Sequence, residues 1–136
     1  MKLFTGSLSL LTFICLTSST AFADCPTPPG LAICESCHTL EPGRKPRATG
    51  PNLVGAAAQL AMHDANFEYY SLAMKAAQAK GLTWTDENLM AYMADPNAFL
   101  NGFNGQELRS AMSFQLKDEA KRKAAVEGLK TISACQ

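Results

Sequence analysis

The sequence has no long hydrophobic run, no excess of charge of either sign and few histidines. Its most apolar stretch, Leu8–Leu16, is shorter than the roughly 20 residues that a helix needs to cross a bilayer. Basic and acidic residues balance at twelve each, so nothing indicates the clustered basic surface that nucleic acid requires. The two histidines limit the imidazole ligands that any metal site could use.

The first 23 residues predict a secretory signal peptide. Lys2 precedes the apolar stretch, and the small residues of Ala21–Ala23 follow it after a polar segment, which is the order of a cleaved export signal. We expect cleavage after Ala23, a periplasmic location, no membrane span, and a mature chain of residues 24–136 that forms a single small domain. Loss of Lys2 leaves this mature chain nearly neutral.

Helical spacing of apolar residues appears in three segments, and no strand-like alternation or internal repeat is convincing. The prolines of Cys25–Gly30 exclude the interior of a helix, so any first helix is short. Proline and glycine from Glu41 to Gly55 predict a long ordered loop. Helices are predicted over 69–80, 85–95 and 117–133. The fold class is therefore all-α, with long connecting loops.

Residues Cys34 to His38 read Cys-Glu-Ser-Cys-His, the C-x-x-C-H pattern of covalent haem attachment. The spacing suits this chemistry because two thiols must reach two vinyl groups of one porphyrin, while the histidine turns its imidazole onto the iron. We expect one haem c held at Cys34 and Cys37, with His38 as an axial ligand. A thioredoxin-like pair would normally sit in a βαβ pattern, and zinc would need a fourth ligand, for which only His63 remains.

A six-coordinate electron carrier needs a second axial ligand on the opposite face of the haem, and a thioether raises the reduction potential relative to a second imidazole. Three methionines lie within apolar helical stripes, where methionine more often fills the core: Met74, Met90 and Met93. Met112 instead follows a glycine-containing loop and precedes the last helix, so we predict that it is the second ligand. The alternatives left open are Met62, His63 and an open sixth site.

Two further cysteines, Cys25 and Cys135, lie near the ends of the mature chain. Export into an oxidising compartment favours a disulfide between them. Two unpaired thiols, or pairing to another chain, are the alternatives.

The order of these motifs resembles the class I c-type cytochromes, both mitochondrial and c2-like, over nearly all of the mature chain. Gly50 to Gly55 reads Gly-Pro-Asn-Leu-Val-Gly, similar to the family's Gly-Pro-Asn-Leu-x-Gly. Met112 to Phe114 resembles the ligand methionine followed by x-Phe, and residues 67–74 and 89–96 resemble two further family segments. The resemblance implies the cytochrome c fold, in which short helices and long loops surround one covalently attached haem.

The same resemblance implies roles for four residues around the haem. The Pro51 carbonyl would accept a hydrogen bond from His38 and so fix the tautomer and orientation of the axial imidazole. Tyr70 and Trp84 match the two aromatic residues that donate to a haem propionate. Tyr92 would pack near the sulfur of the axial methionine.

The chain departs from the family in three places. The stretch from Pro96 to Met112 is longer than in mitochondrial members, and Gln106–Ala111 replaces the usual Pro-Gly-Thr-Lys, so a helical turn is expected there. Gly30 and Gly128 stand where the family packs one aromatic against another, and we expect the terminal disulfide to replace this lost contact. Lysines around the haem edge are sparse, which disfavours strongly charge-steered docking.

We therefore expect a periplasmic electron carrier, not an enzyme, that passes single electrons between redox partner proteins as a monomer or in transient complexes. The leading alternative is the haem subunit of an oxidoreductase complex, such as a dehydrogenase or a sulfur-compound oxidase, which an exposed apolar patch on residues 97–108 would favour. A less favoured alternative is a ligand-binding or peroxidatic haem protein in which Met112 does not bind the iron. The donor, acceptor, pathway and reduction potential stay open.

Overall fold

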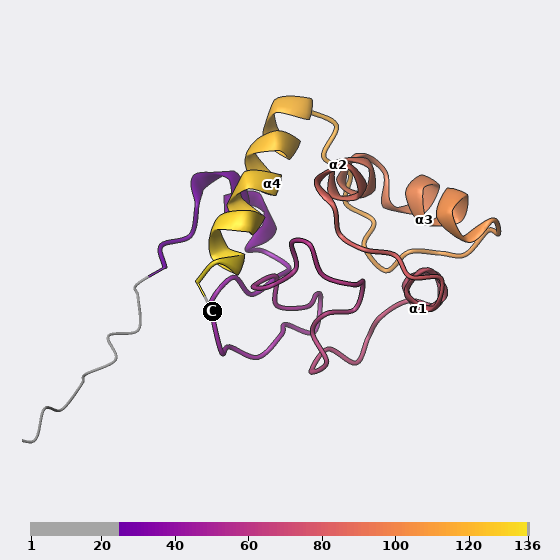
Figure 1. The fold of residues 1–136 in the computed structure, drawn as a ribbon, viewed down its shortest axis with the longest axis horizontal. Coiled ribbons are helices and arrows are strands. Elements are labelled where there is room, and N and C mark those ends of the chain that lie inside the picture. Colours follow the sequence, from indigo (N-terminus) through magenta and orange to yellow (C-terminus); the bar gives the residue numbers. More distant parts are fainter. Residues whose placement is uncertain (1–24, 136) are drawn as a thin grey trace, which may run out of the picture.

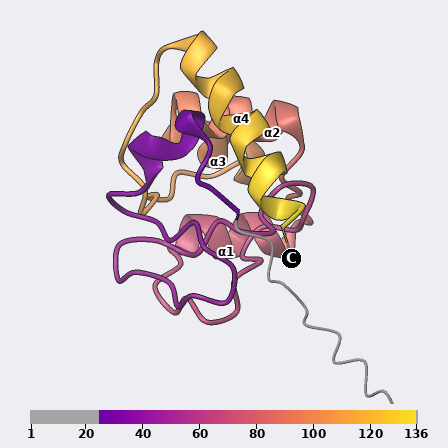
Figure 2. The ribbon, with the colours of Figure 1, turned by 90° about the vertical axis from the view of Figure 1, so that its left-hand side faces the viewer.

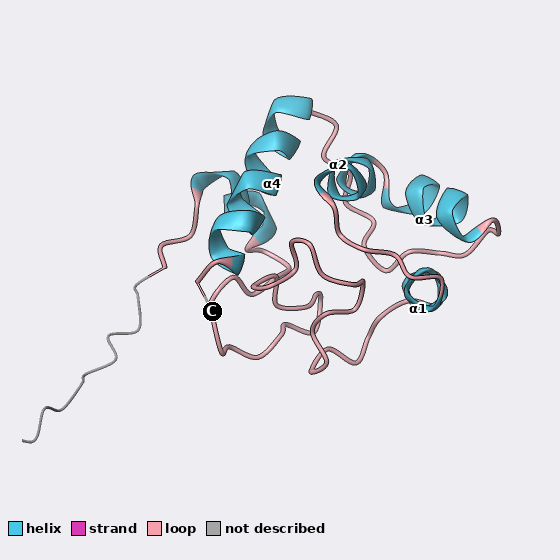
Figure 3. Ribbon diagram, in the orientation of Figure 1, coloured by secondary structure: helices cyan, strands magenta, loops and turns pink. Residues whose placement is uncertain are grey.

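A computed structural model describes residues 25–135, so the predicted signal peptide lies outside the described residues. These described residues fold into four α-helices and one short 3-10 helix, η1 (Pro29–Cys34), α1 (Leu72–Ala79), α2 (Asp86–Ala94), α3 (Pro96–Asn104) and α4 (Glu119–Ser133) (Figure 1). Long loops join them (Figure 3). Within residues 25–135 the only β pairing consists of isolated bridges, which confirms the all-α class.

A polar side chain caps the start of each α-helix by accepting a hydrogen bond from a backbone N–H of the first turn. The four caps are Ser71, Thr85, Asp95 and Asp118. The three predicted helices are confirmed, but the first and last begin later than expected, at Leu72 and Glu119. The short first helix and the long loop after it are confirmed as well.

Helix α3 was not predicted from the sequence. Asp95 and Pro96 end α2 as expected, but they also begin α3, because the Asp95 carboxylate accepts from the Ala98 N–H at 3.0 Å. Proline is well suited to the first position of a helix, where its missing N–H would have no partner. Gly105 then ends α3 with a φ of 68°, the left-handed conformation typical of a helix C-terminus.

The helical turn expected over Gln106–Ala111 is absent, and residues 105–118 form no helix. Two backbone N–H groups of this segment are taken by side chains of α3 instead. Leu108 donates to Asn101 Oδ1 at 2.9 Å, and Ser110 donates to Asn97 Oδ1 at 2.8 Å. The segment therefore lies along α3 as an irregular strap that leads to Met112.

The N-terminal η1 packs against the C-terminal α4 (Figure 2). A Cβ atom on Gly30 would lie 2.3 Å from the Ala124 carbonyl oxygen, and one on Gly128 would lie 2.7 Å from Leu31 Cγ. The two glycines therefore allow close approach of the backbones, and Leu31, which lies against Gly128, is fully buried. The contact that the sequence analysis took as lost is thus present in another form.

The predicted disulfide between Cys25 and Cys135 is confirmed. It joins the segment before η1 to the end of α4, so it reinforces an existing helix contact rather than replacing one. Among residues 25–135, no helix is both long and apolar enough to span a membrane.

The hydrophobic core lies where α2 packs against α4 and α3, and α1 against α3. Leu82, Leu100 and Ile132 are among its fully buried side chains. Met74 and Met93, each 7% exposed, belong to this core, as expected of methionines in helical stripes. The loops of residues 39–71 gather beside the helices, in the lower half of Figures 1 and 2.

Candidate functional site

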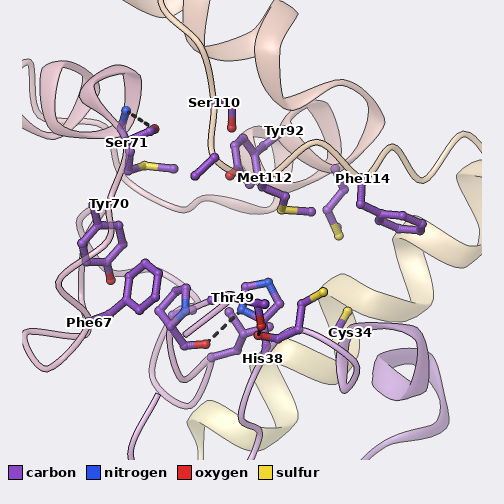
Figure 4. A pocket seen from close by; sticks show the side chains of 18 of the residues that line it. Cys34, His38, Thr49, Phe67, Tyr70, Ser71, Tyr92, Ser110, Met112 and Phe114 are labelled. Carbon is purple, nitrogen blue, oxygen red and sulfur yellow. Dashed lines mark hydrogen bonds between the residues drawn. The ribbon is translucent and has the colours of Figure 1, made fainter. Parts of the chain in front are cut away.

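A cavity of ≈ 630 Å³ lies between two walls of the molecule. Figure 4 shows Cys34 and His38 on one side and Met112 on the other, with the Met112 side chain directed toward His38. Every residue that the sequence analysis placed around a haem lines this cavity: Cys34, Cys37, His38, Pro51, Tyr70, Trp84, Tyr92 and Met112. Folding therefore gathers side chains that are up to 78 positions apart in the chain (34 to 112).

The turn after η1 places both cysteines and His38 on one wall. The N–H groups of Cys37 and His38 donate to the Cys34 carbonyl at 3.1 and 2.9 Å, which closes one tight turn. Cys34 is half-buried and Cys37 is exposed, and neither forms a disulfide. Both thiols are thus available at the edge of the same cavity.

His38 is oriented by the Gly50–Pro51 segment. Its Nδ1 lies 2.9 Å from the Pro51 carbonyl oxygen, and because a carbonyl can only accept, Nδ1 carries the proton and Nε2 is left free for a metal. Burial lowers the pKa of His38, against the opposing effect of the Pro51 hydrogen bond, which favours the neutral form that metals bind. A Cβ atom on Gly50 would lie 2.6 Å from His38 Cε1, so only glycine leaves room for the ring.

The two alternative uses of the cysteine pair fit this environment poorly. Burial raises the pKa of the Cys34 thiol, and the nearby Cys37 and Glu35 raise it further, whereas a redox-active C-x-x-C pair needs a lowered thiol pKa. In the described part of the chain, no group of three or more His, Cys, Asp or Glu side chains could hold a bare metal ion such as zinc.

Met112 lies on the strap between α3 and α4, half-buried. The strap returns to the helices at Leu116, whose N–H donates to the Met93 carbonyl at 2.7 Å. Tyr92 lies next to Met112 and Ser110 in Figure 4. Burial raises the pKa of Tyr92 to about 12, so its phenol stays protonated at neutral pH.

Tyr70 and Trp84 also line the cavity. The Tyr70 hydroxyl donates to the Asp64 carbonyl at 3.2 Å, and burial raises the pKa of this phenol to about 12. Trp84 is buried, and its ring centroid lies 4.9 Å from that of Tyr92. Their contact with a haem propionate stays a prediction.

A hydrogen-bonded group that supports the Pro51–Asn52 segment was not predicted from the sequence. Asn52 donates its backbone N–H to Asp64 Oδ2 at 2.8 Å, and its carbonyl lies 2.7 Å from His63 Nε2. His63 is therefore held against the same Gly50–Asn52 segment that orients His38. Asp64 also accepts from the Asn66 N–H, and a turn of this kind can be predicted from an aspartate in the sequence. The bond between Asp64 and the distant Asn52 has no such local signal.

Comparison with known proteins agrees with this arrangement, although no family model matches the chain. Cytochrome c2 iso-1 of Rhodospirillum centenum is 40% identical over 107 residues, which cover 74% of this chain and 88% of that protein. Cytochrome c2 of Cereibacter sphaeroides is 39% identical over 95 residues, which cover 64% of this chain and 76% of that protein. The solved structure of cytochrome c2 from Rhodospirillum centenum superposes with a TM-score of 0.68 at 36% identity and covers 76% of this chain and 92% of that one.

The chain therefore belongs to the cytochrome c2 family of class I c-type cytochromes. It is a cytochrome c2-type electron carrier and not an enzyme. Family membership implies a covalently bound haem c. The residues present fit such a group. The cavity has two thiols at its edge and the neutral imidazole of His38 with a free Nε2, and Gly50 stands where a larger residue would displace the His38 ring.

Proposed function

We propose that this protein carries single electrons between partner proteins in the periplasm through one haem c. Cys34 and Cys37 attach the haem, and His38 and Met112 bind its iron from opposite faces. The observation that supports this assignment is the single cavity that has the C-x-x-C-H turn on one wall and Met112 on the other. When bound, the haem supplies the one-electron couple of its iron.

The residues around the cavity have separate tasks in this proposal. Pro51 holds the His38 ring through the Nδ1 hydrogen bond, which fixes its tautomer and orientation. Met112 fills the second axial position, so a small molecule such as dioxygen has no free site on the iron. Trp84 donates to a propionate from the cavity lining, and the Tyr70 hydroxyl, which donates to the Asp64 carbonyl at 3.2 Å, turns to a propionate when the haem is bound. The signal peptide predicted over residues 1–23 delivers the chain to the periplasm.

A freely exchanging carrier is favoured over a permanent subunit of a larger complex. A permanent subunit would be expected to have an exposed apolar patch on residues 97–108. In this segment, Phe103 is the one large hydrophobic side chain that is exposed, at 37%. Single exposed hydrophobic residues are common on monomeric proteins, so this segment offers no extended docking surface.

Optical spectroscopy of the purified protein, with and without Met112→Ala, tests the axial ligands. The unchanged protein should show the absorption band of methionine bound to ferric haem. Met112→Ala should abolish that band and allow carbon monoxide to bind the reduced iron readily. Met90→Ala is the matched control, because Met90 is half-buried but does not line the cavity; it should keep the band.

Intact-mass analysis of the secreted protein tests attachment and export. The mass should correspond to a chain that begins at Asp24 and carries one haem, and the protein should be found in the periplasmic fraction. A colourless product with the mass of the bare polypeptide would contradict the proposal, as would a Met112→Ala variant that retains the methionine band.

A further inference from the structure

The peptide group between Pro51 and Asn52 is held by side chains at both ends. Its C=O accepts from His38 Nδ1 at 2.9 Å, and its N–H donates to Asp64 Oδ2 at 2.8 Å. The C=O and N–H of a peptide group belong to one planar, conjugated unit. A single polarisable group thus connects the imidazole of His38 to the carboxylate of Asp64.

Asp64 lies in an environment where its negative charge acts strongly on this peptide. The side chain is only 9% exposed, and its other oxygen accepts from the Asn66 N–H at 3.0 Å. The ion pairs formed among residues 25–135 do not include Asp64, so no direct ion pair offsets its charge. Hydrogen bonds in series polarise one another, and they are stronger away from water.

The loop that presents Asp64 is fixed in place. Met62 has a φ of 62°, a left-handed conformation that non-glycine residues seldom adopt. His63 then reaches the Asn52 carbonyl at 2.7 Å, so consecutive residues hold both the N–H and the C=O of Asn52. The Asn52 side chain donates to the carbonyls of Glu41 and Arg44 at 2.8 and 2.9 Å. The peptide therefore cannot turn away from His38 without breaking several hydrogen bonds.

We propose that Asp64 is a positioning residue that tunes His38 through the Pro51–Asn52 peptide and lowers the reduction potential of the bound haem. The negative Asp64 carboxylate attracts the hydrogen of the peptide N–H. The peptide group is thereby polarised, and more negative charge lies on the Pro51 carbonyl oxygen. That oxygen becomes a stronger acceptor for the Nδ1 proton and makes the imidazole a more basic ligand. A more basic imidazole stabilises the oxidised iron. The inference rests on the proposed role of His38 as an axial ligand.

The test compares Asp64→Asn with Glu68→Gln. Asp64→Asn keeps the size of the side chain and an oxygen acceptor but removes the charge. Glu68→Gln removes a charge from an exposed carboxylate nearby in the same loop, as the matched control. Two quantities are measured: the midpoint potential, and the proton resonances of His38 Nδ1–H and the Asn52 amide in the reduced protein.

Asp64→Asn should raise the midpoint potential and move both proton resonances upfield, because both hydrogen bonds weaken. Glu68→Gln should leave the two resonances unchanged. An unchanged potential in Asp64→Asn would overturn the proposal. A raised potential with an unchanged His38 resonance would do so too, because a charge acting only through space would give that result.

The optical spectrum separates this test from a failure of the proposed function. If the unchanged protein bound no haem, or if His38 were not its ligand, the proposed function would fail before Asp64 was tested. If Asp64→Asn does not fold, Asp64→Ser serves instead, since a serine hydroxyl can also accept from the Asn66 N–H in this turn. It should raise the potential as well.

Discussion

The two walls of the cavity are built in different ways. We call residues 38–68 the histidine wall and residues 105–118 the methionine wall. In the histidine wall, side chains bond repeatedly to backbone groups of the same wall or of the adjoining haem-attachment turn, through Thr39, Arg47, Thr49, Asn52, His63 and Asp64. In the methionine wall, the backbone N–H groups of Leu108, Ser110 and Leu116 donate to α3 and α2.

This difference predicts that the two walls differ in stiffness. The histidine wall is cross-linked within itself, so moving His38 would disrupt many hydrogen bonds together. The backbone N–H groups of residues 111–115 make no hydrogen bond among the described residues, and Met112 lies in this stretch. Regions with few protected backbone hydrogen bonds open first. We therefore expect the methionine to leave the iron long before the histidine does.

The largest expected effect comes from removing the disulfide, which anchors the chain just before the histidine wall. The bridge closes a loop with a sequence separation of 110. In Cys25→Ser/Cys135→Ser, the free energy of unfolding should fall by about 4 to 5 kcal/mol, the chain-entropy value for a loop of this length. Urea denaturation of the haem-loaded protein measures it, and the methionine band should be unchanged in native buffer. Equal midpoints for the two proteins would refute this prediction.

Gly50→Ala tests the packing of the histidine wall. The added Cβ would lie 2.6 Å from His38 Cε1 and 2.9 Å from the Cys37 carbonyl oxygen, and such overpacking costs about 1 to 3 kcal/mol. Gly102→Ala is the control, because nothing lies within 4 Å of its added Cβ on α3. It should stabilise the protein by about 0.5 to 1 kcal/mol, since alanine favours helix. Similar changes in the free energy of unfolding of the two variants would mean that the histidine wall shifts to accommodate the added methyl group.

Asn97→Ala and Asn101→Ala should loosen the methionine wall. Each removes the acceptor for one backbone N–H of the strap, at a cost of about 1 to 3 kcal/mol if that donor finds no new partner. Added imidazole should displace Met112 from ferric haem more easily, as measured by optical titration. Asn88→Ala, which loses a bond to the Thr83 carbonyl outside this wall, should leave imidazole affinity unchanged. An equal gain in imidazole affinity in Asn88→Ala would contradict the role of Asn97 and Asn101 in holding the methionine wall.

The smallest effects concern two tyrosines, Tyr70 beside the histidine wall and Tyr92 beside the methionine wall. Burial raises the pKa of each to about 12 from an ordinary value of 10.0. Folding therefore favours the protonated phenol, so this contribution to stability is complete below about pH 10 and is lost as the pH rises toward 12.

Tyr70→Phe and Tyr92→Phe should each reduce this alkaline loss. Urea denaturation at about pH 9 and about pH 11 measures it against the unchanged protein. At the lower pH, Tyr70→Phe should also cost about 1 kcal/mol, because it removes the one hydrogen bond that the phenol can donate. A steeper loss of stability in either variant would show that the phenol ionises more easily in the folded protein.

Local features of the chain were predictable from the sequence. The C-x-x-C-H turn depends on five consecutive residues, and the Thr85 cap depends on a helix that begins at the next residue. The helix over Pro96–Asn104 was missed because Asp95-Pro96 can both end one helix and begin another. In the folded protein the Asp95 carboxylate begins α3 by accepting from the Ala98 N–H, and Asn97 and Asn101 then hold the strap against this helix.

The sequence by itself determined the haem-attachment motif and the helical class. It also favoured the pairing of the terminal cysteines, and its resemblance to a known family indicated the residues that gather at the cavity. Only the tertiary structure decided how His38 is supported. A carboxylate in a loop is usually solvated, and nothing near Asp64 in the sequence points to Asn52. The left-handed turn at Met62 and the return of the 58–68 loop bring the two together, because a backbone N–H gains a buried partner only when distant segments pack.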